Sequence, residues 1–167
     1  MERDEERAFL ERLIRDFESA TGRRPRGWLG PAFTSTMNTI ELLAELDFDY
    51  TPGCANDDQP YPLRASAGRI ISLPYSSEVN DIPAFVLRHH TAEQFAQSVI
   101  DQFDVLYEEG AERPCVMGIG IHGFCGQPFR ALHFGRALAH MAARPDVWLA
   151  TSDEIASWYI GAAGLAA

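Results

Sequence analysis

The sequence predicts an α/β fold, a partial (β/α) barrel in which about five mostly parallel strands alternate with helices. Short apolar segments rich in β-branched residues alternate along the chain with amphipathic stretches of helical period. The segment 116–122 (VMGIGIH) is almost continuously apolar, which is typical of a parallel strand covered on both faces. A complete eight-stranded barrel takes about 250 residues, so a chain of 167 residues supplies roughly half to two-thirds of one.

The first half of the chain is expected to contain two helices and three strands. In chain order these are a helix over 1–20, a strand at 27–29, a helix capped by Thr34 or Ser35, and strands at 48–51 and 69–75 on either side of a polar loop at 52–62. Apolar residues recur at spacings of three and four in both helices, and Gly22 follows the end of the first. Isoleucines dominate the strand at 69–75 (RIISLPY).

The second half is expected to alternate helix and strand. Its elements are a helix over 91–109, the strand at 116–122, a helix over 128–143, a strand at 147–150 and a helix over 153–160. Thr91, Pro128 and Ser152 stand at the three helix starts, where a cap or an early proline is favoured. Residues 1–160 are expected to form a single domain, and residues 161–167 a frayed tail.

Charge and cysteine content exclude several classes of protein. The net charge is −10, which disfavours binding to nucleic acid or to an anionic membrane surface. Three separated cysteines do not make a disulfide framework and fit a reducing compartment. Since the sequence has no signal-peptide pattern and no apolar stretch long enough to span a bilayer, it predicts a cytoplasmic protein.

Two groups of candidate residues follow the first strands, where parallel sheets present their ligand-binding loops. Trp28 is either the wall of an apolar pocket or a core tryptophan. Asp57 and Asp58, in the loop that ends at Tyr61, are either site carboxylates or part of an ordinary Asx turn before proline.

Two further groups follow later strands. Glu78, Asn80 and Asp81 form a polar loop after the strand at 69–75, which is either part of a site or a solvated turn. His122 ends the buried strand at 116–122 and is the sharpest candidate, as a general acid or base. A core histidine is the alternative. No classical zinc spacing, phosphate loop or nucleophile elbow is present.

A family resemblance runs through nearly the whole chain, from about residue 5 to residue 159. The residues that carry it are Arg24–Pro31 with Asn38 and Thr39, Asn56–Tyr61, Leu73–Ser76 with Glu78, Asn80 and Asp81, Asp101–Gly110, and Ile121-His122 with Gly126–Pro128 and Arg130. Together they resemble the polysaccharide deacetylase (NodB-homology) family, in the branch close to the cofactor-free allantoinases. The matching segments correspond to the C-terminal portion of the family domain.

The resemblance implies a distorted (β/α) barrel and hydrolysis of a carbon–nitrogen bond that is not a peptide bond. It implies that His122 is the general acid that protonates the leaving amine, and that Asp57 and Asp58 line the site and orient that histidine. Trp28, Tyr61, Glu78 and Asn80 are expected to bind a small amide or amino-sugar substrate.

The family's T-F-D-[DE]-like base motif and H-x-x-x-H-like metal motif have no match in this sequence. No cofactor or metal ligand set is therefore expected within the chain, and a divalent metal requires ligands from a missing half. The expected partner is a complementary N-terminal half or a second copy of the chain. The alternative is a non-catalytic remnant that binds a small ligand or oligomerises.

Overall fold

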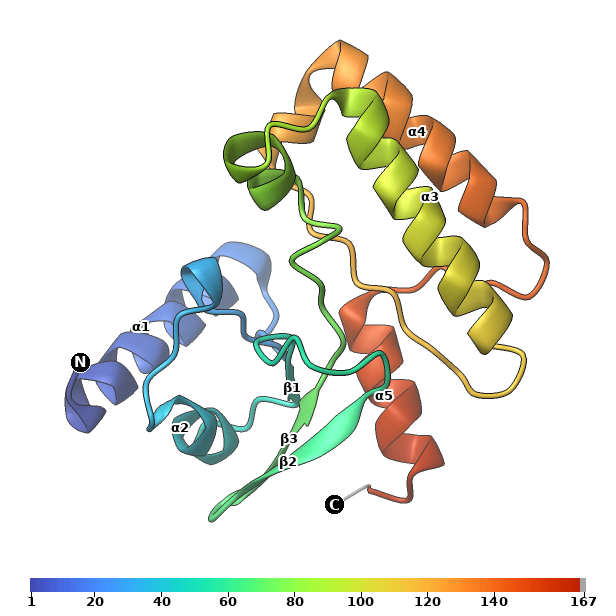
Figure 1. Ribbon diagram of the computed structural model, residues 1–167. Helices are drawn as coiled ribbons and strands as arrows, with labels where there is room; N and C mark the ends of the chain where they lie inside the picture. Colours follow the sequence, from blue (N-terminus) through green and yellow to red (C-terminus); the bar gives the residue numbers. More distant parts are fainter. Residues whose placement is uncertain (166–167) are drawn as a thin grey trace. The chain divides into compact units, whose positions relative to one another are not determined.

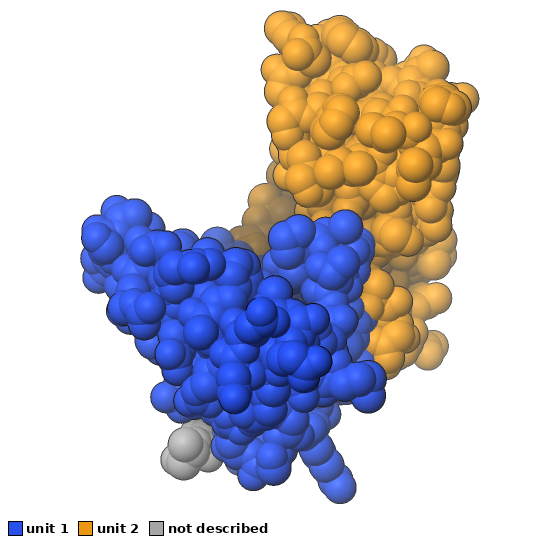
Figure 2. Space-filling view, turned by 90° about the vertical axis from the view of Figure 1, so that its left-hand side faces the viewer, with its two compact units in different colours: residues 1–54, 60–73, 151–167 blue, residues 55–59, 74–150 orange. Residues whose placement is uncertain are grey.

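The computed structural model describes residues 1–165 and has α/β architecture (Figure 1). The chain packs as two compact units (Figure 2). Unit 1 contains residues 1–54, 60–73 and 151–167, and unit 2 contains residues 55–59 and 74–150. The α/β class is thus confirmed, whereas the single domain over 1–160 stays a prediction.

Unit 1 has a small sheet and three helices. Its elements are α1 (Arg3–Thr21), a 3-10 turn (Pro31–Phe33), α2 (Thr39–Glu45), β1 (Tyr50–Thr51), β2 (Tyr61–Ala65), β3 (Gly68–Ser72) and α5 (Ser152–Ala162). The strand order is β1-β3-β2, with β1 parallel to β3 and β2 antiparallel to it. β2 was not expected: its first residues fall in the predicted loop at 52–62, and it forms a hairpin with β3 that turns before Gly68 (φ 141°).

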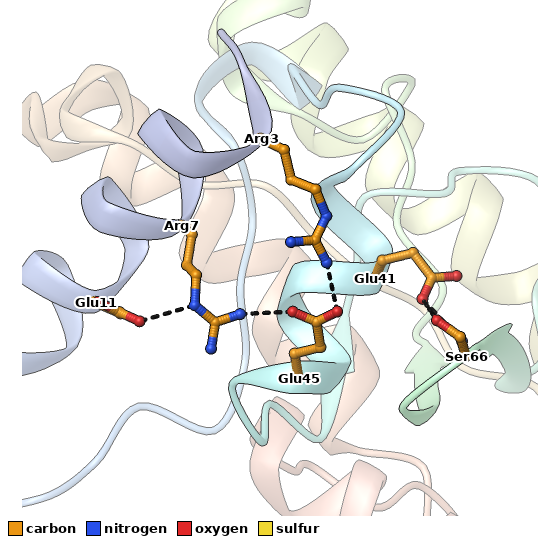
Figure 3. Close-up of polar contacts among 6 residues, drawn as sticks. All are labelled: Arg3, Arg7, Glu11, Glu41, Glu45 and Ser66. Carbon is orange, nitrogen blue, oxygen red and sulfur yellow. Dashed lines mark hydrogen bonds and ion pairs between the residues drawn. The ribbon is translucent and has the colours of Figure 1, made fainter.

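Apolar faces and ion pairs hold α1 and α2 together. Leu10 of α1 and Leu42 of α2 are almost completely buried in one cluster. At its edge Arg7 Nη1 lies 2.6 Å from Glu45 Oε2, and Arg3 contacts the other oxygen of the same carboxylate (Figure 3). α1 ends at Gly22, which has the left-handed φ of 71° that the sequence predicted for a helix C-cap.

Unit 2 is built on two long helices. They are α3 (Ala92–Glu109) and α4 (Pro128–Ala142), accompanied by a π-helical turn (Pro83–Leu87) and a 3-10 turn (Gly123–Gly126). α3 and α4 run side by side in the same direction (Figure 1), because Phe95 stacks on Phe134 and His140 contacts Asp104. Thr91 caps α3 in a capping box with Gln94, as the sequence predicted.

The expected five strands are not all formed in the described part of the chain. Gly27 and Gly120 each make one isolated parallel bridge, to Tyr50 and Asn80 respectively, in place of continuous strands. Beside the segment 116–122, the backbone of Pro74 lies against Gly118, and proline has no N–H to donate to a ladder.

The segment 147–150 is not a strand either: Trp148 and Leu149 are 56% and 65% exposed, and no strand pairs with it in residues 1–165.

The helix boundaries differ from expectation by a few residues. α2 begins after Asn38, and neither Thr34 nor Ser35 caps it. The cap of α5 is Thr151, whose hydroxyl accepts from the N–H of Glu154. α5 continues through residue 162, so fraying does not begin at 161; residues 166–167 of the expected tail lie outside the described residues.

Candidate active site

A histidine and a buried carboxylate form the most clearly organised polar pair of unit 2. The Nδ1 atom of His122 lies 2.7 Å from Oδ1 of Asp81, and the backbone N–H of His122 donates to Oδ2 at 2.7 Å. The Asp81 side chain is 0% exposed, whereas the His122 side chain is 44% exposed. The carboxylate is therefore fixed inside the protein while the imidazole remains accessible.

Backbone pairing between two segments distant in sequence brings the pair together. The N–H of Asp81 donates to the carbonyl of Gly120 at 3.0 Å, and the N–H of Gly120 donates to the carbonyl of Val79 at 3.1 Å. These are the bonds of a short parallel bridge. His122 then follows Gly120 by two residues and precedes the 3-10 turn at Gly123–Gly126, so it stands at the end of the predicted strand segment.

The negative charge of Asp81 influences its buried neighbours. Burial and the Asp81 carboxylate raise the pKa of the Cys125 thiol to about 11. Burial and the same carboxylate also raise the pKa of Tyr75. Near Cys125, the Arg130 guanidinium lies 4.1 Å from the centre of the Phe85 ring and donates to the carbonyl of Phe124.

The His122–Asp81 arrangement has the chemistry of a general acid or base. A carboxylate only accepts hydrogen bonds, so the proton on this side of the ring belongs to Nδ1, and Nε2 is the nitrogen available for proton transfer. A carboxylate at Nδ1 also fixes the ring orientation and stabilises the imidazolium. The pair can therefore deliver or accept a proton at a bound substrate.

Asp57 and Asp58 make other contacts. Oδ1 of Asp57 accepts from the N–H of Gln59 at 3.0 Å, the Asx turn that was the structural alternative. Oδ2 of Asp58 accepts from Arg113 at 3.0 Å and from the Cys115 thiol at 3.7 Å. The carboxylate in contact with His122 in the described structure is Asp81, whereas the site roles expected of Asp57 and Asp58 stay predictions.

A cavity of about 200 Å³ lies in unit 2, on the side of these two aspartates. Its polar lining consists of Asp57, Asp58, Tyr75, Ser76 and Gln102, over an apolar floor that includes Val79 and Leu106. His122 does not belong to this lining. The cavity and the His122–Asp81 pair are therefore distinct features of unit 2.

One group of possible metal ligands occurs among residues 1–165. Ligand atoms of Asp58, Glu109 and Cys115 all lie within 4.8 Å of one another. The Arg113 guanidinium already contacts both carboxylates, at 3.0 Å and 3.1 Å. Because the Arg113 guanidinium already contacts oxygens of both carboxylates and offsets part of their charge, the donor set does not fit a resident divalent metal in this conformation.

The other candidate residues divide between the two units. In unit 1, Trp28 packs edge-on against Phe9 and Phe48, with ring centres 6.5 and 6.4 Å apart, which are the contacts of a core tryptophan. Tyr61, also in unit 1, begins β2 opposite Ser72. Their roles toward a substrate stay predictions.

In unit 2, Glu78 and Asn80 differ sharply. Glu78 is largely exposed and pairs with Arg88 at 2.7 Å. Asn80 is only 4% exposed, and its side-chain amide contacts Tyr75 and Ile82. A buried amide engaged in two internal hydrogen bonds is poorly placed to bind a substrate directly.

Comparisons with known proteins agree with this architecture. No family model matches the sequence. A protein of Schizosaccharomyces pombe described as "Putative polysaccharide deacetylase" is 31% identical over 160 aligned positions, which cover 83% of this chain and 48% of that protein. The solved structure of Puue allantoinase superposes with a TM-score of 0.89 at 30% identity, over 96% of this chain and 54% of its own.

The chain is related to the polysaccharide deacetylases. A probable polysaccharide deacetylase from Pseudomonas aeruginosa PAO1 is also similar, with 32% identity, a TM-score of 0.87, and coverage of 96% of this chain and 55% of its own. The resemblance read from the sequence is thereby confirmed. The chain spans about half the length of the polysaccharide deacetylases and the allantoinase that it matches.

The sequence does not show the link between Asp81 and His122. Asp81 appeared only as one member of a polar loop, because its link to His122 depends on a backbone bridge across about forty residues of chain. The clue in the sequence was the Asn-Asp pair before Ile82-Pro83, a pattern that begins a helical turn.

No helix in residues 1–165 is long and apolar enough to cross a membrane.

Proposed function

We propose that this chain carries the general-acid part of a polysaccharide deacetylase-like hydrolase that cleaves a non-peptide carbon–nitrogen bond in a small amide or amino sugar. The observation that supports this most is the contact between His122 and the buried Asp81. The names of the relatives, polysaccharide deacetylase and allantoinase, support the same class of bond.

In the proposed step, His122 transfers one proton to the leaving nitrogen of the substrate. Water adds to the carbonyl carbon of the substrate, the carbon–nitrogen bond breaks, and Nε2 of His122 donates its proton to the leaving nitrogen. Asp81 holds the ring in place and stabilises its charged form before the transfer. No step is assigned to a metal, because the Arg113 guanidinium already contacts Asp58 and Glu109 of the Asp58–Glu109–Cys115 group.

The group that activates the water is proposed to come from another polypeptide, either a complementary half or a second copy. The parallel bridges at Gly27 and Gly120 support the finer proposal that each unit carries strands of a partial (β/α) barrel. Strands without neighbours leave backbone groups that another chain can pair with.

The test is hydrolysis of a panel of N-acetylated amino sugars, ureides and simple amides by this chain, alone and mixed with a candidate complementary half. We expect release of amine or carboxylate in the mixture, and a slower release with Asp81→Asn. If substrate binds but is not hydrolysed, either by the chain alone or by the mixture, the non-catalytic alternative is favoured instead. Light scattering over a range of concentrations measures the expected self-association.

A further inference from the structure

Asn80 lies next to Asp81, and both polar atoms of its side-chain amide make hydrogen bonds inside the protein. Its Oδ1 accepts from the N–H of Ile82 at 3.0 Å, and its Nδ2 donates to the hydroxyl of Tyr75 at 3.0 Å. Its carbonyl accepts from the N–H of Ala84 at 3.1 Å. Asn80 therefore opens the helical turn in which Asp81 is the first residue, and anchors the start of that turn to Tyr75.

Gly120 completes this arrangement from the other segment. A Cβ atom added at Gly120 would lie 2.4 Å from the Tyr75 hydroxyl and 2.8 Å from Nδ2 of Asn80. Contacts this short are not tolerated without movement, so Tyr75 and Asn80 can approach only a bare α-carbon. The same Gly120 accepts the backbone bond from Asp81 and stands two residues before His122.

We propose that Asn80 is a positioning residue for the His122–Asp81 pair, and that its position depends on the Tyr75 hydroxyl and on the absence of a side chain at Gly120. Its catalytic meaning rests on the proposed function. The inference replaces the substrate-binding role expected for Asn80 from the sequence. Asn80 acts on the reaction only through the orientation of Asp81, whose carboxylate fixes both the backbone and the ring of His122.

Three variants separate the contacts. Asn80→Ala removes both side-chain bonds, Asn80→Ser keeps a hydroxyl that can cap the turn but does not reach Tyr75, and Gly120→Ala introduces the clash. Asn38→Ala is the matched control for asparagine, since Asn38 precedes α2 without a side-chain cap bond. Gly135→Ala is the matched control for glycine, because nothing lies within 4 Å of its added Cβ.

The first measurement is the ¹⁵N and ¹H NMR signal of the His122 imidazole, which reports the Nδ1 proton and does not require turnover. We expect that signal to weaken or shift in Asn80→Ala and Gly120→Ala, to be partly restored in Asn80→Ser, and to stay unchanged in both controls. An unaltered Nδ1 signal in a folded Asn80→Ala would overturn the proposal. Tyr75→Phe, which deletes one oxygen and adds no bulk, provides the test if Gly120→Ala does not fold.

The second measurement separates positioning from substrate contact. Positioning predicts that Asn80→Ala lowers kcat by about 10–100-fold with little change in KM, because a displacement of about 1 Å can cost that much in rate. A raised KM with unchanged kcat, together with a native His122 signal, would instead restore the substrate-binding role. If no substrate is turned over at all, the proposed function fails while the NMR result still decides the positioning of His122.

Discussion

Asp81, with a completely buried carboxylate, binds both the backbone N–H and the ring Nδ1 of His122, each at 2.7 Å. A carboxylate shielded from water interacts with its partner more strongly than an exposed one. Burying a carboxylate costs free energy unless its oxygens accept hydrogen bonds. Because His122 makes one contact to each oxygen of Asp81, a displacement of His122 would leave that buried charge poorly compensated. The structure therefore couples the stability of unit 2 to the geometry of its candidate acid.

Tyr50 gives unit 1 a pH dependence at high pH. Its hydroxyl donates to Asp153 of α5 at 2.7 Å, and burial followed by this carboxylate raises its pKa far above the usual 10.0. Above pH 10 the unfolded chain loses this proton while the folded chain keeps it, so stability falls as pH rises. The slope is at most about 1.4 kcal/mol per pH unit, and screening of the half-buried hydroxyl by solvent narrows the pH range over which it applies.

The measurement is urea unfolding between pH 8 and pH 12. Tyr50→Phe should be less stable than the wild type at pH 8 and should show a shallower loss above pH 10. Tyr107→Phe, on α3 in unit 2, is the control and should keep the wild-type slope. Parallel curves for wild type and Tyr50→Phe would contradict the prediction.

Cys125 should be the least reactive of the three cysteines. It is 5% exposed, and burial together with Asp81 raises its pKa to about 11. At pH 8 only about one thousandth of this thiol is ionised, and the thiolate is the reactive form. Timed alkylation followed by peptide mass spectrometry should label Cys54 and Cys115, both partly exposed, well before Cys125. Equal alkylation rates for all three cysteines in the folded protein would contradict the burial and the raised pKa of Cys125.

Zinc should bind the chain weakly, because the Arg113 guanidinium contacts Asp58 and Glu109 and offsets part of their negative charge. Removing that cation should expose the ligand group, so Arg113→Ala should tighten zinc binding by roughly tenfold or more. Isothermal calorimetry measures both affinities, with Arg113→Ala/Cys115→Ser as the control that removes the thiolate ligand. A stoichiometric micromolar zinc site in the wild type would contradict this account of Arg113.

Local signals in the sequence predicted most of the helices. Thr91 and Gln94 cap α3, and Gly22 ends α1, because capping depends on residues only a few positions apart. Strand pairing was predicted less well, since it depends on partners distant in the chain. The apolar pattern of 116–122 gives no sign that Pro74 lies beside Gly118 and removes a donor.

The candidate site shows the same division between local and distant information. His122 was identified from its place at the end of an apolar segment. The carboxylate that contacts His122 could not be read from nearby residues. Asp57 and Asp58 bond to other groups, Gln59 and Arg113. Asp81 meets His122 because the backbone of Asp81 pairs with Gly120. The sequence therefore pointed to His122 as a candidate acid, and the structure shows that the carboxylate in contact with it is Asp81.

The decisive prediction concerns His122 in an assay where hydrolysis is detected. A general acid acts as the carbon–nitrogen bond breaks, so its contribution appears in the transition state and hardly in the bound substrate. His122→Ala should lower kcat by about 10²–10⁴-fold with a small change in KM. Asp81→Asn should give a smaller loss, because the ring remains but its Nδ1 contact loses the negative charge.

The chain contains a matched control for this experiment. His140 and Asp104 form a second histidine–aspartate pair, also with 2.7 Å between nitrogen and oxygen, on the α3–α4 contact of unit 2. His140→Ala removes the same side chain from a packing position, where the ring lies edge-on to Phe103, and should leave kcat near the wild-type value in the folded protein. A loss of turnover in His140→Ala that equals the loss in His122→Ala would mean that histidine–aspartate pairs matter here for folding alone, and the assignment of His122 as the acid would then fail.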